Sequence, residues 1–170
     1  MTTYLVLTAI GEDKPGLVES LAQVIADNSG NWLESSMSQL AGKFAGILRV
    51  SVSDNDADQL IGALDSISDQ LKLVIERVDT DKLAESQQTI ELNLVGNDRA
   101  GIIREISQVL ANLSINVEQL TTECSPAPMS SDVLFKAKAI LKVPANLEQD
   151  VLQQEIEQLA DDLIVEIQLN

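Results

Sequence analysis

Histidine is absent from this 170-residue chain, cysteine occurs once, and aromatic residues make up only 2% of it. A single cysteine forms no intramolecular disulfide and no cysteine-based metal cage within one chain. Without histidine, its thiol also lacks the base that activates a cysteine nucleophile. Acid–base chemistry would depend on carboxylates alone. We therefore expect a protein that is not an enzyme and holds no metal or other cofactor, with a core of Leu, Ile, Val and Ala.

Basic residues are also scarce, because 11 Lys and Arg stand against 27 Asp and Glu, for a net charge of −16. The negative charge divides equally between residues 1–85 and 86–170. Binding to a phosphate backbone requires clustered Lys and Arg that release counterions. The composition predicts no direct contact with nucleic acid and favours a partner with a basic or apolar surface.

The chain also lacks membrane and export signals. No run approaches the roughly 20 apolar residues of a membrane-spanning helix, and residues 1–10 carry no basic leader or cleavage pattern. We expect a cytoplasmic protein that does not contact a membrane. A length of 170 residues suits two small domains.

An internal repeat runs through the whole chain. Shifting the sequence by half its length aligns three residues of a short turn, placing Gly11, Asp13 and Gly16 on Gly96, Asp98 and Gly101. The apolar positions keep their spacing under the same shift. Such self-similarity indicates a duplicated structural unit. We predict one domain over residues 1–80, a linker over 81–88 and a second domain over 89–170.

Each copy predicts the order β-α-β-β-α-β. Alternating apolar residues indicate a first strand, a glycine-bounded turn follows, and i, i+3, i+4 spacing then indicates a helix. Two strands, a second helix and a last strand complete the copy, with strands expected near 32–40, 47–52 and 71–78, and near 117–122, 133–141 and 164–169. This order predicts an α+β, ferredoxin-like domain: a four-stranded antiparallel sheet with both helices on one face.

Three local signals accompany this prediction. Gly30 suits a left-handed stop after the first helix. Asn146, with Gln149 three residues later, resembles a capping box at the start of the last helix. Residues 125–131, rich in Ser and Pro, predict a flexible loop.

The candidate site is the duplicated turn Gly-x-Asp-(Lys/Arg)-x-Gly between the first strand and the first helix. One interpretation is structural: Asp13 and Asp98 cap the helices, and the glycines adopt turn conformations. The other is functional, because free N–H groups at a helix start accept a carboxylate and a nearby Asp or Asn accepts an ammonium. A free amino acid carries both groups. The residues alone favour neither interpretation.

The duplicated turn in two βαββαβ copies resembles tandem ACT domains, regulatory modules that bind amino acids between copies. Residues 13–16, Asp-Lys-Pro-Gly, fit the family's usual turn, whereas residues 98–101 lack its proline. The resemblance covers essentially the whole chain, so we expect no separate catalytic or DNA-binding domain. By position it implies the ligand contacts Glu12, Asp13 and Gly16 in the first copy and Asn97, Asp98 and Gly101 in the second. Asn31 and Asn116, at the start of the second strand, either border this site or form a turn.

Size and acidity make the chain similar to the glycine cleavage system transcriptional repressor family. That resemblance implies a repressor that responds to glycine and acts through a separate LysR-type transcriptional activator protein rather than on DNA. An orphan ACT subunit that regulates an amino-acid metabolic enzyme is the alternative. Whether the copies pair within one chain or between the chains of a homodimer stays open.

Overall fold

The computed structural model describes residues 1–79 and 87–169. The chain divides into two compact units, residues 1–83 (unit 1) and 84–170 (unit 2). Most of the predicted linker, residues 81–86, lies outside the described residues, and residues 87 and 88 already belong to the first strand of unit 2. No helix in the described part of the chain is both long and apolar enough to cross a membrane.

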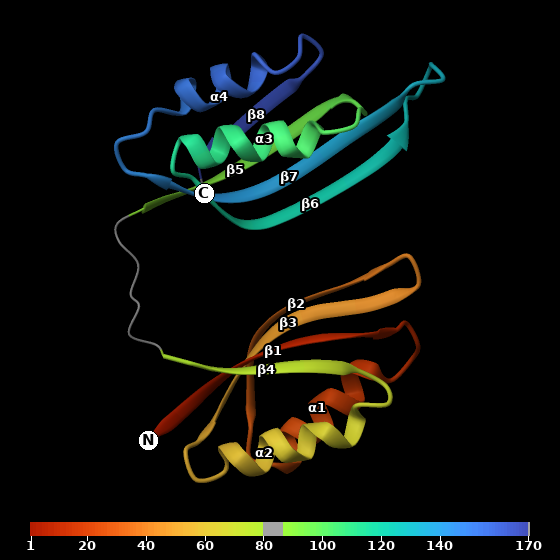
Figure 1. Cartoon of the computed structure of the whole chain (residues 1–170), viewed down its shortest axis with the longest axis vertical. Helices are drawn as coiled ribbons and strands as arrows, with labels where there is room; N and C mark the ends of the chain where they lie inside the picture. The colour runs from red at the N-terminus through yellow and green to blue at the C-terminus, as the bar shows by residue number, and fades with distance from the viewer. Residues whose placement is uncertain (80–86, 170) are drawn as a thin grey trace. The chain divides into compact units, whose positions relative to one another are not determined.

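Both units follow the predicted order of elements (Figure 1). Unit 1 contains β1 (Thr2–Glu12), α1 (Leu17–Asp27), β2 (Asn31–Leu40), β3 (Lys43–Ser53), α2 (Ala57–Leu64), the 3-10 turn η1 (Asp65–Ile67) and β4 (Lys72–Val78). Unit 2 contains β5 (Gln87–Asn97), α3 (Ile102–Asn112), β6 (Asn116–Pro126), β7 (Val133–Pro144), α4 (Gln149–Glu157) and β8 (Ile164–Leu169).

Each unit is built on a four-stranded antiparallel sheet. The strand order is β2-β3-β1-β4 in unit 1 and β6-β7-β5-β8 in unit 2. In each unit the two helices lie on the same face of the sheet (Figure 1). The predicted α+β, ferredoxin-like arrangement is confirmed for both units.

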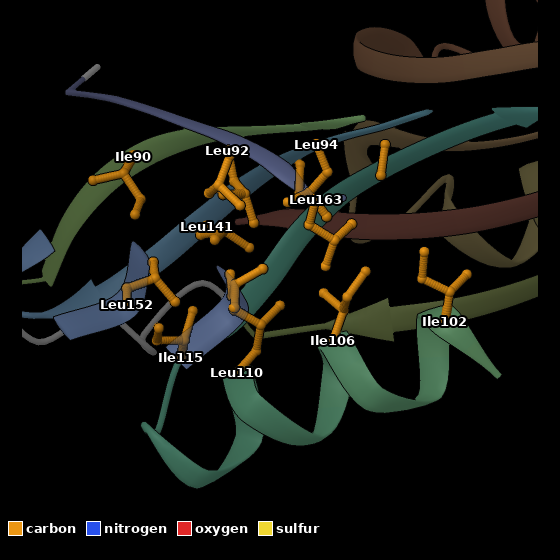
Figure 2. Packing of buried hydrophobic residues seen from close by; sticks show 14 of the residues in the cluster. Ile90, Leu92, Leu94, Ile102, Ile106, Leu110, Ile115, Leu141, Leu152 and Leu163 are labelled. Atoms are coloured by element: carbon orange, nitrogen blue, oxygen red, sulfur yellow. The ribbon is translucent and has the colours of Figure 1, made fainter. Parts of the chain in front are cut away.

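The core of each unit lies between the sheet and its helices. In β1 the side chains of Leu5, Leu7 and Ala9 are buried while those between them are more exposed, as expected of a strand with one covered face. In unit 2 the four-residue spacing of Ile102, Ile106 and Leu110 places them on one side of α3. Figure 2 shows these side chains pointing toward Leu92 and Leu94 of β5 and the other apolar residues of the sheet.

The core of unit 2 contains an unfilled space. A cavity of about 40 Å³ with almost entirely apolar walls remains between α3 and the sheet, lined by residues that include Leu110, Val117 and Ala139. Ala139 pairs with Leu92 as Leu48 pairs with Leu7 in unit 1, so an alanine replaces a leucine. Val117 likewise takes the strand position of Trp32, which packs against the core of unit 1.

The predicted role of Gly30 is wrong. Ser29 adopts the left-handed conformation after α1, with φ of 61°, and Ser114 does the same after α3, with φ of 56°. Gly30 is needed for space instead, because a Cβ atom there would lie 2.8 Å from Cγ2 of Ile25. The side chain of Ile115 is buried at the matching position of unit 2.

The predicted capping box is also wrong. Helix α4 begins at Gln149 with Glu148 as its N-cap residue, so Asn146 lies too early in the chain to cap it. A turn forms there instead, in which the Leu147 N–H donates to the Pro144 carbonyl at 3.0 Å. The predicted 125–131 loop is shorter than expected, since β6 continues to Pro126, which pairs with Val133.

Candidate functional site

The turn between β1 and α1 owes its shape to a glycine. Gly16 precedes the helix with φ of 89° and ψ of 2°, a left-handed conformation that residues with a Cβ resist. A Cβ atom on Gly16 would meet nothing within 4 Å, so the backbone conformation alone requires glycine. Gly101 of unit 2 repeats this geometry with φ of 86°.

Glycine, rather than aspartate, occupies the N-cap position of both helices. Gly16 and Gly101 are the N-cap residues of α1 and α3, and no side chain donates or accepts a capping hydrogen bond at either helix. The interpretation in which Asp13 and Asp98 cap the helices, one of the two that the sequence left open, is therefore wrong. Their backbone N–H groups instead tie the turn to the next hairpin, donating to the carbonyls of Gly42 at 3.0 Å and Val133 at 2.8 Å.

The turn of unit 2 is held by ionic contacts within the unit. Arg99 donates from both terminal nitrogens to the Glu105 carboxylate, with 3.0 Å between Nη1 and Oε1. This hydrogen bonding lowers the pKa of Glu105 and raises the pKa of Arg99. The N–H of Asn97 donates to Oδ2 of Asp162 at 2.7 Å. These partners restrain both ends of the turn.

The turn of unit 1 has a different set of contacts. Glu12 forms an ion pair with Lys43, the first residue of β3. The position that holds Glu105 in unit 2 is Ser20 in unit 1, so the helix offers Lys14 no matching carboxylate. The side chains of Asp13 and Lys14 are exposed.

The lone cysteine lies beside the turn of unit 2. Desolvation and the neighbouring Asp98 carboxylate raise the pKa of the Cys124 thiol. A raised pKa keeps the thiol protonated and makes it a poor nucleophile. Asp98 therefore lies beside a thiol, whereas Asp13 does not, because Cys124 is the only cysteine of the chain.

Asn31 and Asn116 begin β2 and β6 as expected, but they lie away from the turn of their own unit. Asn31 of β2 pairs with Ser51 of β3, which pairs in turn with Tyr4 of β1. Glu12 ends β1 eight residues after Tyr4. At roughly 3.3 Å per residue, about 26 Å separates the two ends. Asn116 is displaced from Asn97 in the same manner. Within one unit, the structure does not bring these asparagines to the candidate site.

The structure adds residues to the turn of unit 1 that the sequence did not reveal. A depression of about 430 Å³ lies beside it, and its lining includes Glu12, Lys14, Lys43, Asp69 and Lys72. Lys43 and Lys72 reach the turn through strand pairing, opposite Glu12 and Ile10. That proximity follows from sheet register, which periodicity alone does not determine. No cluster suited to a metal ion occurs among the described residues.

Comparison with known proteins finds a family model that matches most of unit 1. Residues 3–77 match the family model of the ACT domain. A crystal structure of an unknown protein from Galdieria sulphuraria is 26% identical, covers 100% of this chain and 99% of its own, and superposes with a TM-score of 0.88. The crystal structure of a proposed glycine cleavage system transcriptional repressor is 19% identical, with coverage of 100% and 99% and a TM-score of 0.71. No relative was found among curated proteins.

Proposed function

Because residues 3–77 match the ACT domain family model and unit 2 repeats their fold, we propose that this chain is an amino-acid-responsive regulator of transcription. It represses glycine cleavage system expression by contact with a separate LysR-type activator protein in the cytoplasm, and glycine is its ligand. The observation that carries the proposal is the left-handed glycine turn, which occurs in both units with an aspartate three residues before the helix N-cap.

The geometry of the turn suits both ends of an amino acid. The left-handed glycine directs the chain into the helix, whose first N–H groups attract a carboxylate. No side chain competes for those groups as a cap in α1 or α3. The Asp13 and Asp98 carboxylates are available to an ammonium group. In the proposed site, Glu12 and Asn97 border the ligand, and Gly16 and Gly101 allow its close approach to the backbone.

The test of ligand binding is calorimetry with glycine on the full chain. Losing a charged hydrogen bond commonly costs about 1.5–3 kcal/mol, so Asp13→Ala and Asp98→Ala should each weaken binding at their own site about ten- to hundredfold. Asp58→Ala is the matched control, because it removes an exposed carboxylate of unit 1 that pairs with Arg77. Absence of glycine binding, or unchanged affinity in both site variants, contradicts the proposed sites.

Charge supports contact with a basic partner. A net charge of −16 attracts positively charged surfaces and repels nucleic acid. A ligand controls such a complex only if it binds the free and partner-bound forms with different affinities. If glycine weakens the complex tenfold, the complex must weaken glycine binding by the same factor.

The test of partner choice is a pull-down from cell extract with and without glycine. Capture of a LysR-type activator that glycine releases supports the proposal. Capture of an amino-acid metabolic enzyme instead identifies the chain as a regulatory subunit of that enzyme. A complex with the activator that no amino acid affects refutes the sensing mechanism while leaving repression intact.

A further inference from the structure

The depression beside the turn of unit 1 is formed by three separate segments. The turn after β1, the start of β3, and residues 68–70 ahead of β4 all contribute to its lining. Gly11 allows the last of these to pack directly on β1, since a Cβ atom there would lie 2.3 Å from the Gln70 carbonyl oxygen. At about 430 Å³ the depression has the size of a small-molecule site. We call it the lysine depression.

Its charge is opposite to that of the protein around it. Residues 1–79 contain twelve acidic and only five basic side chains, yet three of those five, Lys14, Lys43 and Lys72, line the lysine depression. The facing carboxylates are Glu12 and Asp69. Glu12 pairs with Lys43, whereas neither Lys14 nor Lys72 has a carboxylate within 4 Å among the described residues. Three ammonium groups against two carboxylates leave a net charge of +1.

Unit 2 shows that the fold does not require these lysines. Leu134 is paired with Asn97 as Lys43 is with Glu12, and Ile164 is paired with Val95 as Lys72 is with Ile10. The third counterpart, Arg99, is held by Glu105. The two units share the turn, the sheet and the helix, so the cationic lining is a property of unit 1 and not of the architecture.

We propose that the lysine depression binds a small organic anion that has two carboxylates and therefore carries more carboxylate than ammonium groups. An acidic amino acid and a four- or five-carbon dicarboxylate share this chemistry. One carboxylate lies between Lys14 and Lys72, and the ammonium of an amino acid faces Asp69. Glycine, with one group of each sign, leaves the +1 lining uncompensated. This inference does not depend on the proposed function, whose critical carboxylates are Asp13 and Asp98.

Exposed ion pairs are individually weak, so binding depends on several lysines acting together and on low salt. The experiment therefore titrates L-glutamate, succinate and glycine separately into the full chain by NMR at low ionic strength, with sodium chloride matched in ionic strength as the blank. The expected result is saturable binding of glutamate or succinate, with amide shifts at residues 68–72. If both glutamate and succinate bind, the site recognises the two carboxylates that they share. If only glutamate binds, the ligand is an amino acid.

The variants Lys72→Ile and Lys43→Leu place the residues of unit 2 in unit 1. We expect each to weaken anion binding by about tenfold or more, which corresponds to about 1.4 kcal/mol. Lys136→Leu is the control, because it removes the same charge from β7 of unit 2, where Lys136 pairs with Glu123. The inference is overturned if both unit 1 variants bind the anions as tightly as the unchanged protein does. It is also overturned if the control loses as much affinity as they do, or if neither anion saturates the protein. Glycine binding that depends on Asp13 or Asp98 supports the proposed function but does not support the inference about the lysine depression.

Discussion

The cavity under α3 permits a quantitative test of packing. Ala139 lines it, is only 4% exposed and lies on a strand, where a β-branched residue fits well. The Ala139→Val variant adds two methyl groups to the space of about 40 Å³. Each buried methyl group contributes about 0.8 kcal/mol. Removing the void adds up to about 1 kcal/mol at roughly 24 cal/mol per Å³.

Lost side-chain entropy and imperfect fit oppose these gains by roughly 1 kcal/mol. We therefore expect Ala139→Val to raise the free energy of unfolding by about 1–2 kcal/mol, which moves the thermal midpoint of a unit of this size by about 4–16 °C. Urea denaturation measures the change directly, provided that the slope with denaturant is the same in both proteins.

Two further variants make this measurement specific. Ala45→Val places the same substitution at a half-buried position of β3 in unit 1, away from the cavity. It should change the free energy of unfolding by less than about 0.5 kcal/mol. Leu48→Ala creates the corresponding space in unit 1 and should cost about 2–5 kcal/mol. Destabilisation by Ala139→Val of more than about 1 kcal/mol would refute the reasoning, because it would mean that the walls are already in contact.

Three other outcomes are expected. Gly101→Ala should destabilise the protein by about 1–2 kcal/mol in chemical denaturation, since its cost comes from the left-handed backbone and not from a clash; a change near zero contradicts this. Hydrogen bonding to Arg99 lowers the folded-state pKa of Glu105, so this pair stabilises the protein above the unfolded pKa and is lost as pH falls through the folded value. Glu105→Gln should therefore flatten the decline of stability below about pH 4, and an unchanged pH profile excludes the pair as its source. The protein alone should give no sequence-specific gel shift with duplex DNA at physiological salt, and such a shift would contradict the proposed action through a partner.

The fold could be predicted because its signals are local and occur twice. Alternation in β1 and β5 and four-residue spacing in α1 and α3 each depend on a few adjacent residues, and the repeat checks every element against its copy. Failures occurred where two residues compete for one backbone role. Ser29 took the left-handed position expected of Gly30, because the glycine is needed for close contact with Ile25.

The candidate site was predictable only in part. The turn itself follows from its glycines, and Gly16 and its counterpart Gly101 take the left-handed conformation. The neighbours of the turn depend on register instead: pairing brings Lys43 and Lys72 to it and carries Asn31 to the far end of the sheet. Sequence spacing does not contain that information, because shifting a strand by two residues preserves its buried face but changes every cross-strand neighbour.

Strand order has a consequence for synthesis on the ribosome. The first strand made, β1, occupies an interior position and needs both β3 and β4 as neighbours. About 75 residues separate the beginning of β1 from the end of β4, which corresponds to roughly 4–15 s of translation at about 5–20 residues per second. During that interval the apolar face of β1 lacks its final sheet. Unit 1 nonetheless completes its sheet while unit 2 is still being made, so the nascent chain is expected to fold one unit at a time.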